Sequence, residues 1–353
     1  MNKQEGNHRG AVFHHTTDFV LESGRVLKGF QLYYEVLGSD NLHKGKLIWV
    51  CHALTGNATV TDWWGGLFGK GKLYDPDEYT IICVNTLGGC YGSTGPLSTN
   101  PETQTPYYHD FPALTNRDIV RAFDLLRNFL GVQKVHTLIG SSLGGQQALE
   151  WGIMQPDVFE NMVIIASNAY HSPWGIAFNE SQRMAISLDK TWALNQDDAG
   201  MEGMKTARSI ALLSYRSYET YQRSQTEEDH DKVDFYKASS YQRYQGEKLA
   251  KRFNAYTYWL LSKAMDSHHV GRDRGGAETA LRQIIANTLI VSVNSDLLFP
   301  VEEQQFLAKN IKNAQLKIID SCFGHDGFLI ETDQIEGCIR QFYGQTFLNT
   351  QKI

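Results

Sequence analysis

Short, continuous apolar runs recur along the chain and predict buried β-strands. They occupy residues 47–51, 81–84, 135–139, 162–165, 289–293 and 316–319. A continuous run, unlike an alternating one, is typical of a strand that is covered on both faces. Between two of these runs, Ile119, Phe123, Leu126 and Leu130 recur at helical spacing. That helix is expected to begin at 115–118, whose Thr-Asn-Arg-Asp sequence resembles a capping box.

This alternation of strands and helices predicts a mostly parallel sheet with helices on both sides. The stretch 170–285 differs, because it is polar and contains no β-rich run; its segments 203–215 and 246–264 are expected to be helical. Since strand-like runs resume near residue 288, we interpret 170–285 as a helical insertion. Residues 1–169 and 286–353 would together form the core. A separate downstream domain is the alternative.

Length and charge narrow the class of protein. The 353 residues suffice for one large α/β domain with an insertion. The net charge of -6 gives no reason to expect nucleic acid or an anionic membrane as a partner. Residues 1–8 are polar, so we expect no signal peptide, and no apolar run approaches membrane-spanning length. The five cysteines form no C-x-x-C pair, which favours reduced thiols in a cytoplasmic protein.

A serine lies at a sharp turn between a predicted strand and a predicted helix. Gly140-Ser141-Ser142-Leu143-Gly144 follows the 135–139 run and precedes a helical segment at 146–154. In a G-x-S-x-G turn of this kind, the serine hydroxyl stands above the sheet as a nucleophile. The motif alone is weak evidence in a chain with 31 glycines. It predicts an acid and then a histidine later in the chain, each after a strand.

Both residues are present. Asp296 follows the 289–293 run, and His325 follows the 316–319 run. Taken singly, Asp296 would be a helix N-cap before residues 300–303 and His325 an ordinary loop histidine. In this order they favour a catalytic triad, in which His325 takes the proton of Ser142 and Asp296 orients the imidazole.

Acyl chemistry on a serine also needs donors for an oxyanion. One is expected from the backbone N–H of Leu143, directly after the nucleophile. The other is assigned to the N–H of Leu54, in the loop after the 47–51 run. His52, in the same loop, is interpreted as structural. No metal site is expected, because no His/Cys/Asp cluster has ligand spacing.

The chain resembles the homoserine O-acetyltransferase family, an acyl-transferring branch of the α/β-hydrolase fold. The resemblance runs from about residue 20 to 340 and is carried by residues 51–56, 88–96, 140–151, 295–300 and 324–331. It implies acetyl transfer from acetyl-CoA to the hydroxyl of L-homoserine through an acyl-serine, a step of methionine biosynthesis. Acetyl-CoA would be a substrate, and no bound cofactor is implied.

The resemblance also implies substrate-binding residues. Asp326 matches the position that binds the amine, Arg208 and Tyr215 match the pair that binds the carboxylate, and Thr55 matches a position at the substrate site. Arg208 and Tyr215 are two helical turns apart, so both can face one pocket. From spacing alone, a solvated helix arginine stays as the alternative interpretation of Arg208.

Finally, the resemblance implies that the helical insertion is a lid and that it forms a two-fold homodimer contact. This chain has Ser141 and Leu143 where the family usually has glycine and methionine, and it also departs at Asn57, Thr59 and Gly327. These departures leave acetyl versus succinyl donors open. Because relatives in the family also acylate serine, the choice between homoserine and serine as acceptor stays open too. A serine esterase on the same triad is the alternative outside the family. Lys70, Lys72 and arginines of the lid are candidate partners of the CoA phosphates, with no basis for choosing.

Overall fold

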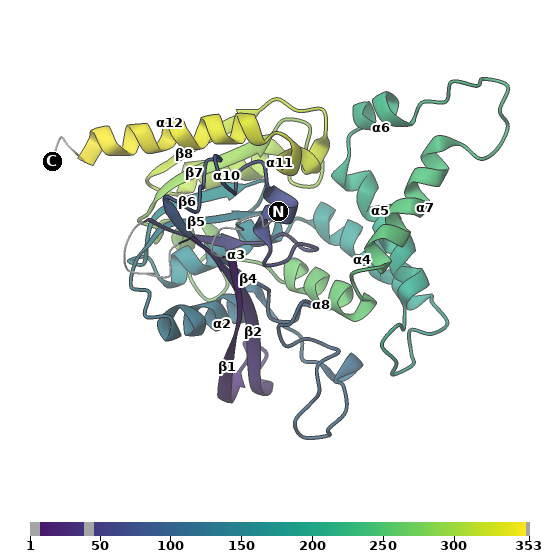
Figure 1. Cartoon of the computed structure of the whole chain (residues 1–353), viewed down its shortest axis with the longest axis horizontal. Helices are drawn as coiled ribbons and strands as arrows, with labels where there is room; N and C mark the ends of the chain where they lie inside the picture. Colours follow the sequence, from purple (N-terminus) through teal and green to yellow (C-terminus); the bar gives the residue numbers. More distant parts are fainter. Residues whose placement is uncertain (1–7, 39–45, 351–353) are drawn as a thin grey trace, which may run out of the picture.

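A computed structural model describes residues 8–38 and 46–350 (Figure 1). The polar residues 1–7, on which the prediction of no signal peptide depends, lie outside the described residues. The described chain forms an eight-stranded sheet in the order β1-β2-β4-β3-β5-β6-β7-β8. All pairs from β4 to β8 are parallel, whereas β1, β2 and β4 pair antiparallel. The predicted fold class is confirmed.

Each predicted strand is present. The strands are β3 (Lys46–Cys51), β4 (Tyr79–Val84), β5 (Val135–Ser141), β6 (Phe159–Ile165), β7 (Asn287–Val293) and β8 (Ala314–Ile319). Two further strands, β1 (His8–Val20) and β2 (Val26–Leu37), were not predicted from the sequence. They form an antiparallel hairpin at the edge of the sheet, and buried and more exposed residues are interspersed along β2. A search for continuous apolar runs therefore passes over them.

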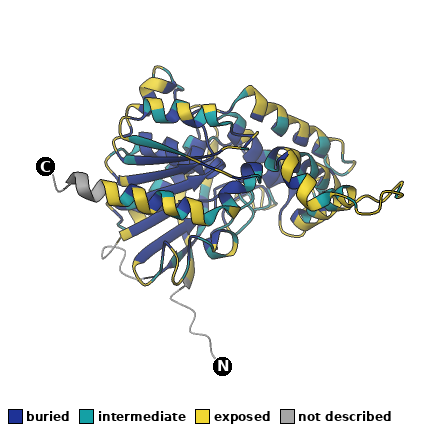
Figure 2. Ribbon diagram, turned by 90° about the horizontal axis from the view of Figure 1, so that it is seen from above, coloured by how far each residue is buried: buried dark blue, intermediate teal, exposed yellow. Residues whose placement is uncertain are grey.

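Helices cover both faces of the sheet, as Figure 2 shows by the buried strands between more exposed helices. On one face, buried residues of α2 (Asn116–Phe129), α3 (Leu143–Met154), α9 (Ala277–Leu281) and α10 (Val301–Asn310) join one hydrophobic cluster. On the other face, α1 (Val60–Trp64) and α12 (Thr332–Thr350) pack in a second cluster. The predicted capping box at Thr115 is present, with reciprocal bonds between Thr115 and Asp118.

The chain between β6 and β7 is helical and projects to the right of the sheet in Figure 1. Besides α9, it contains α4 (Pro173–Ser187), α5 (Met201–Tyr215), α6 (Tyr218–Gln225), α7 (Lys237–Ala250) and α8 (Ala255–Asp266). The prediction of one helical segment over 246–264 is wrong. The chain breaks after Ala250, and Asn254 caps a new helix by accepting a hydrogen bond from the Thr257 N–H at 2.8 Å.

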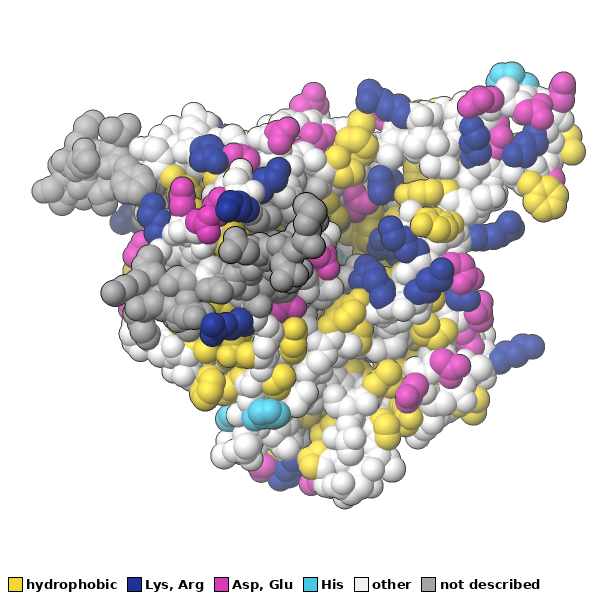
Figure 3. All heavy atoms as spheres, viewed as in Figure 1, with side chains coloured by type: hydrophobic (Ala, Val, Ile, Leu, Met, Phe, Trp, Pro, Cys, Tyr) yellow, Lys and Arg dark blue, Asp and Glu magenta, His cyan; other side chains and the backbone are white. Residues whose placement is uncertain are grey.

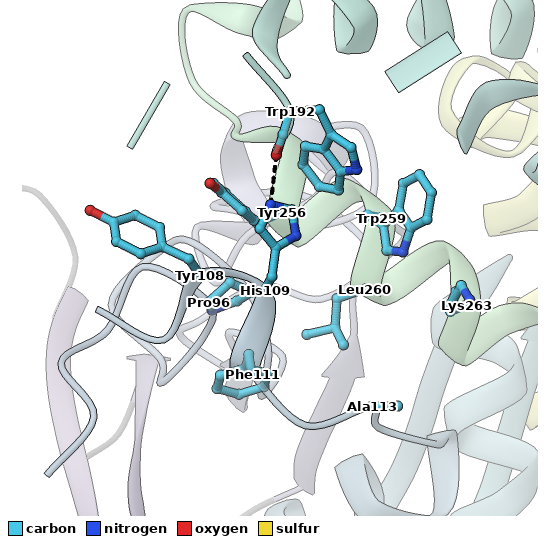
Figure 4. A pocket seen from close by; sticks show the side chains of 10 residues that line it. All are labelled: Pro96, Tyr108, His109, Phe111, Ala113, Trp192, Tyr256, Trp259, Leu260 and Lys263. Atoms are coloured by element: carbon cyan, nitrogen blue, oxygen red, sulfur yellow. Dashed lines mark hydrogen bonds between the residues drawn. The ribbon is translucent and has the colours of Figure 1, made fainter. Parts of the chain in front are cut away.

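An aromatic cluster joins this helical segment to the core. The His109 ring lies 4.5 Å from Trp192 and 4.9 Å from Tyr256, and His109 Nε2 donates to the Trp192 carbonyl at 2.6 Å (Figure 4). The rings, with Trp259 and Lys263, line a cavity of about 140 Å³. Among the described residues, no helix is long and apolar enough to cross a membrane.

Candidate active site

Ser142 lies at the junction of β5 and α3 in a backbone conformation that is rare for a residue with a side chain. Its φ is 54° and its ψ is -124°. Small neighbours make the turn sterically feasible. A Cβ atom at Gly140 would lie 2.2 Å from the Gly144 carbonyl oxygen, and one at Gly144 would lie 2.0 Å from the carbonyl oxygen of Cys51. The second distance also shows that the start of α3 packs closely against the end of β3.

The structure brings the three predicted triad residues together, and all three are buried. His325 Nε2 lies 2.9 Å from Ser142 Oγ, and His325 Nδ1 lies 2.7 Å from Asp296 Oδ2. Because a carboxylate only accepts hydrogen bonds, Nδ1 carries the proton and Nε2 is left to accept from the serine hydroxyl. This is the tautomer that a general base needs.

Surrounding groups hold both Asp296 and His325 in place. The second oxygen of Asp296 accepts from the N–H groups of Leu298 and Phe299 at 2.8 and 2.9 Å. Asp296 is therefore held by a turn; Pro300 occupies the N-cap position of α10. The imidazole of His325 stacks on the Phe299 ring at 5.1 Å, and the Tyr215 ring lies 5.7 Å from it. Loss of rotational freedom before the reaction favours catalysis.

Leu54 and Leu143, the predicted oxyanion donors, lie on neighbouring segments. Leu143 is the first residue of α3, so its N–H has no acceptor within the helix. Leu54 is buried in the loop after β3, which pairs with β5. His52 uses both ring nitrogens within this region, at 2.8 Å from the Ala53 carbonyl and 3.1 Å from the Thr86 N–H. Burial lowers the pKa of His52 to about 4, which keeps it neutral.

Of the predicted substrate-binding residues, Tyr215 and Asp326 lie next to His325. The Tyr215 ring is near both His325 and Arg208, whose guanidinium carbon is 5.2 Å from the tyrosine ring centroid. Within the described chain, Arg208 has no carboxylate partner at ion-pair distance. Burial raises the pKa of the Tyr215 hydroxyl, and Arg208 opposes this rise. Asp326 directly follows His325 and is mostly buried, with 13% of its side chain exposed.

Two arginines of the helical segment were not among the predicted site residues. Arg216 Nε lies 2.7 Å from Asp326 Oδ2, an ion-pair distance, although its N–H is not aligned well enough for a hydrogen bond. Arg252 Nη1 donates to the carbonyl of Thr55 and to the Tyr91 hydroxyl, both at 2.7 Å. The Thr55 loop is thus tied to the corner between α7 and α8. Nothing in the spacing of these arginines could have revealed either contact.

The chain is similar to known proteins over most of its length. A family described as "alpha/beta hydrolase fold" matches residues 46–332. The homoserine O-acetyltransferase of Cyclobacterium marinum is 49% identical over 332 residues, which cover 94% of each chain. The chain belongs to the homoserine O-acetyltransferase family. A solved homoserine O-acetyltransferase from Staphylococcus aureus is 30% identical, with a TM-score of 0.78 over 97% of this chain and 96% of that one.

Likeness of fold extends beyond this family. Esterase E22 has a TM-score of 0.85 at 24% identity and covers 95% of this chain and 99% of its own. That likeness shows the fold alone. What distinguishes a homoserine O-acetyltransferase from such an enzyme must therefore lie in particular side chains. Across residues 8–38 and 46–350, no group of three or more His, Cys, Asp or Glu residues is arranged to hold a metal ion.

Proposed function

We propose that the protein transfers an acetyl group from acetyl-CoA to the hydroxyl of L-homoserine through an acyl-enzyme on Ser142. The family membership supports this reaction. The observation that carries the proposal is the charge near the triad: Asp326 follows His325 directly, and Arg208 contacts Tyr215, whose ring is near His325. A zwitterionic acceptor needs an anion for its ammonium and a cation for its carboxylate, whereas a simple ester needs neither.

In the first half-reaction, Ser142 Oγ attacks the thioester carbon while His325 Nε2 takes the hydroxyl proton. The oxyanion that forms is held by the N–H groups of Leu54 and Leu143. Collapse of this intermediate breaks the carbon–sulfur bond. His325 returns its proton to the sulfur, and CoA leaves as a thiol.

In the second half-reaction, His325 deprotonates the hydroxyl of homoserine, which attacks the acetyl-serine. The same oxyanion donors act again, and Ser142 leaves with the proton from His325. Arg208, supported by Tyr215, binds the carboxylate of homoserine, and Asp326 binds its ammonium. Thr55 lies in the oxyanion loop, where we place it at the substrate. A bidentate guanidinium suits a carboxylate better than a lysine ammonium does.

Residues 170–285 act in this proposal as a lid on the core formed by 1–169 and 286–353. Water must be kept from the acyl-enzyme, and a covering segment does so. Lys and Arg side chains gather on this segment in the face shown by Figure 3, where the phosphates of CoA would need cations. Unpaired cysteines support a cytoplasmic location.

We also propose that the lid forms a homodimer contact. Large apolar or aromatic side chains of its helices are exposed: Leu213 on α5 at 57%, Tyr218 on α6 at 79% and Tyr244 on α7 at 59%. Exposed side chains of this kind are typical of interfaces. Light scattering on Tyr244→Glu should show a shift from dimer towards monomer, and a monomeric parent protein would contradict the contact.

To test this function, the release of free thiol from acetyl-CoA is measured with and without homoserine, and the acetylated product is identified. Steady release that depends on homoserine and yields O-acetylhomoserine is the expected result. Thiol release that does not depend on homoserine and yields acetate would indicate an esterase. Parallel reactions with succinyl-CoA and with serine determine the donor and the acceptor.

A further inference from the structure

The acceptor side of the site contains one more cation than a zwitterion requires. Arg208 and Arg216 both lie there, against the single carboxylate of Asp326. Arg216 already approaches one oxygen of that carboxylate at 2.7 Å. Asp326 is therefore paired before any ligand binds. An unpaired buried carboxylate would cost free energy.

The backbone holds Arg216 at this place. It ends α5 in an extended conformation, and the next residue, Ser217, caps α6. The hydroxyls of Ser217 and Thr220 both donate to the carbonyl of Cys322, in the loop before His325. A Cβ atom at Gly324 would lie 3.0 Å from the carbonyl carbon of Arg216, so the two segments pack backbone against backbone. Arg216 is thus fixed on the histidine loop and is not a free surface side chain.

Tyr221, another polar group of this corner, does not take the place of the arginine. The pKa of Tyr221 is raised to about 12, first by burial; Arg216 lowers it and Asp326 raises it, so its hydroxyl lies near both. That hydroxyl donates to Gln242 Oε1 at 2.9 Å. Among the described residues, Arg216 is accordingly the cation paired with Asp326.

We propose that Arg216 is the standing counter-charge of Asp326, and that it makes acceptor selectivity depend more on the carboxylate of the acceptor than on its ammonium. This inference rests on the proposed function. With Arg216 in place, an acceptor without an ammonium leaves Asp326 still paired. An acceptor without a carboxylate brings only its ammonium. That ammonium would be a third cation, after Arg208 and Arg216, beside the single carboxylate of Asp326. Without Arg216, an acceptor lacking its ammonium would leave Asp326 buried and unpaired.

The experiment compares three acceptors: L-homoserine, gamma-hydroxybutyrate, which lacks the ammonium, and aminopropanol, which lacks the carboxylate. The parent enzyme should use hydroxybutyrate better than aminopropanol. In Arg216→Gln, kcat/KM for hydroxybutyrate relative to homoserine should fall by about tenfold or more, and the value for aminopropanol relative to homoserine should rise. Arg216→Lys should restore both ratios towards those of the parent, because it retains the cation.

The matched control is Arg223→Gln. It also removes an arginine, from the exposed face of α6, where 67% of its side chain is exposed and it pairs with Glu219. Its acceptor ratios should equal those of the parent. Acyl-enzyme formation is measured on each variant, so that acceptor effects are expressed relative to the donor half-reaction.

Two results would overturn the inference. If Arg216→Gln lowers kcat/KM equally for all three acceptors, the arginine only supports the fold. If the hydroxybutyrate ratio is unchanged while homoserine and hydroxybutyrate are both weakened, Arg216 binds the carboxylate directly. A parent enzyme without homoserine-dependent turnover would instead refute the proposed function, so the two failures are distinguishable.

Discussion

Glu303 should make the stability of the fold fall as the pH rises. This residue lies in α10, and its Oε2 accepts from Asn168 Nδ2 at 2.9 Å. Burial, the first cause, and then the negative charge of Asp296 raise its pKa from 4.5 to about 7, against hydrogen bonds from Asn168 and Ser172 that lower it. In Glu303→Gln the side chain keeps an acceptor for Asn168 but can no longer ionise.

Stability falls with rising pH because the folded and unfolded chains bind the Glu303 proton with different affinity. The folded protein holds the Glu303 proton more tightly than the unfolded chain, so below pH 4.5 the residue makes no difference. Between pH 4.5 and about 7 the unfolded chain ionises first and stability is lost. At about 1.4 kcal/mol per pKa unit, the full loss above pH 7 is about 3 kcal/mol. A chain of 353 residues has an unfolding entropy near 0.7 kcal/mol per kelvin, so this corresponds to about 4 °C in Tm.

The assay is thermal unfolding of the parent and of Glu303→Gln at pH 5 and pH 8. The variant should gain about 3 °C on the parent between the two pH values, because at pH 5 the unfolded chain has already ionised in part. Glu302→Gln, a change at the exposed neighbouring position, should gain far less. An equal difference in Tm between parent and Glu303→Gln at both pH values would refute a raised pKa of Glu303.

Three further substitutions test the site and the fold. Ser142→Ala should remove the acyl-enzyme and lower kcat by about 10⁴-fold or more, and mass spectrometry after exposure to acetyl-CoA should find no adduct. Arg208→Lys should raise the KM for homoserine about tenfold by replacing a bidentate contact, whereas an unchanged KM would make Arg208 a solvated helix residue. Gly144→Ala should destabilise the protein by at least about 3 kcal/mol in denaturant unfolding, because its Cβ would lie 2.0 Å from the carbonyl oxygen of Cys51.

Residues that topology alone positions could be predicted from the sequence. In a parallel sheet the carboxyl ends of neighbouring strands meet at one edge. β5, β6, β7 and β8 are neighbours in this order, so a serine after β5, an acid after β7 and a histidine after β8 necessarily face the same edge. Order along the chain was therefore enough to anticipate that Ser142, Asp296 and His325 would come together.

Features that depend on packing between distant segments could not be predicted in this way. The hairpin of β1 and β2 was missed because its strands are covered unevenly, and the break before α8 was missed because the helical pattern continues across it. Arg216 and Arg252 are ordinary arginines in the sequence. Their partners, a carboxylate and a backbone carbonyl, lie more than a hundred residues away and are reached only after the helical segment docks on the core.

That docking divides the proposed chemistry between two parts of the chain. The groups proposed to form the acyl-enzyme, Ser142, His325 and Asp296, all follow strands of the sheet, and esterase E22 shares this fold. In the proposal, Arg208 and Tyr215 bind the acceptor and Arg216 pairs with Asp326; all three arise from α5 or its C-terminal end, in the helical segment. Overall superposition cannot separate the two classes of enzyme, since the TM-score is 0.85 with the esterase and 0.78 with the Staphylococcus aureus transferase. On this reasoning, substitutions on α5 change which nucleophile receives the acetyl group, whereas substitutions at the strand ends change whether it is loaded at all.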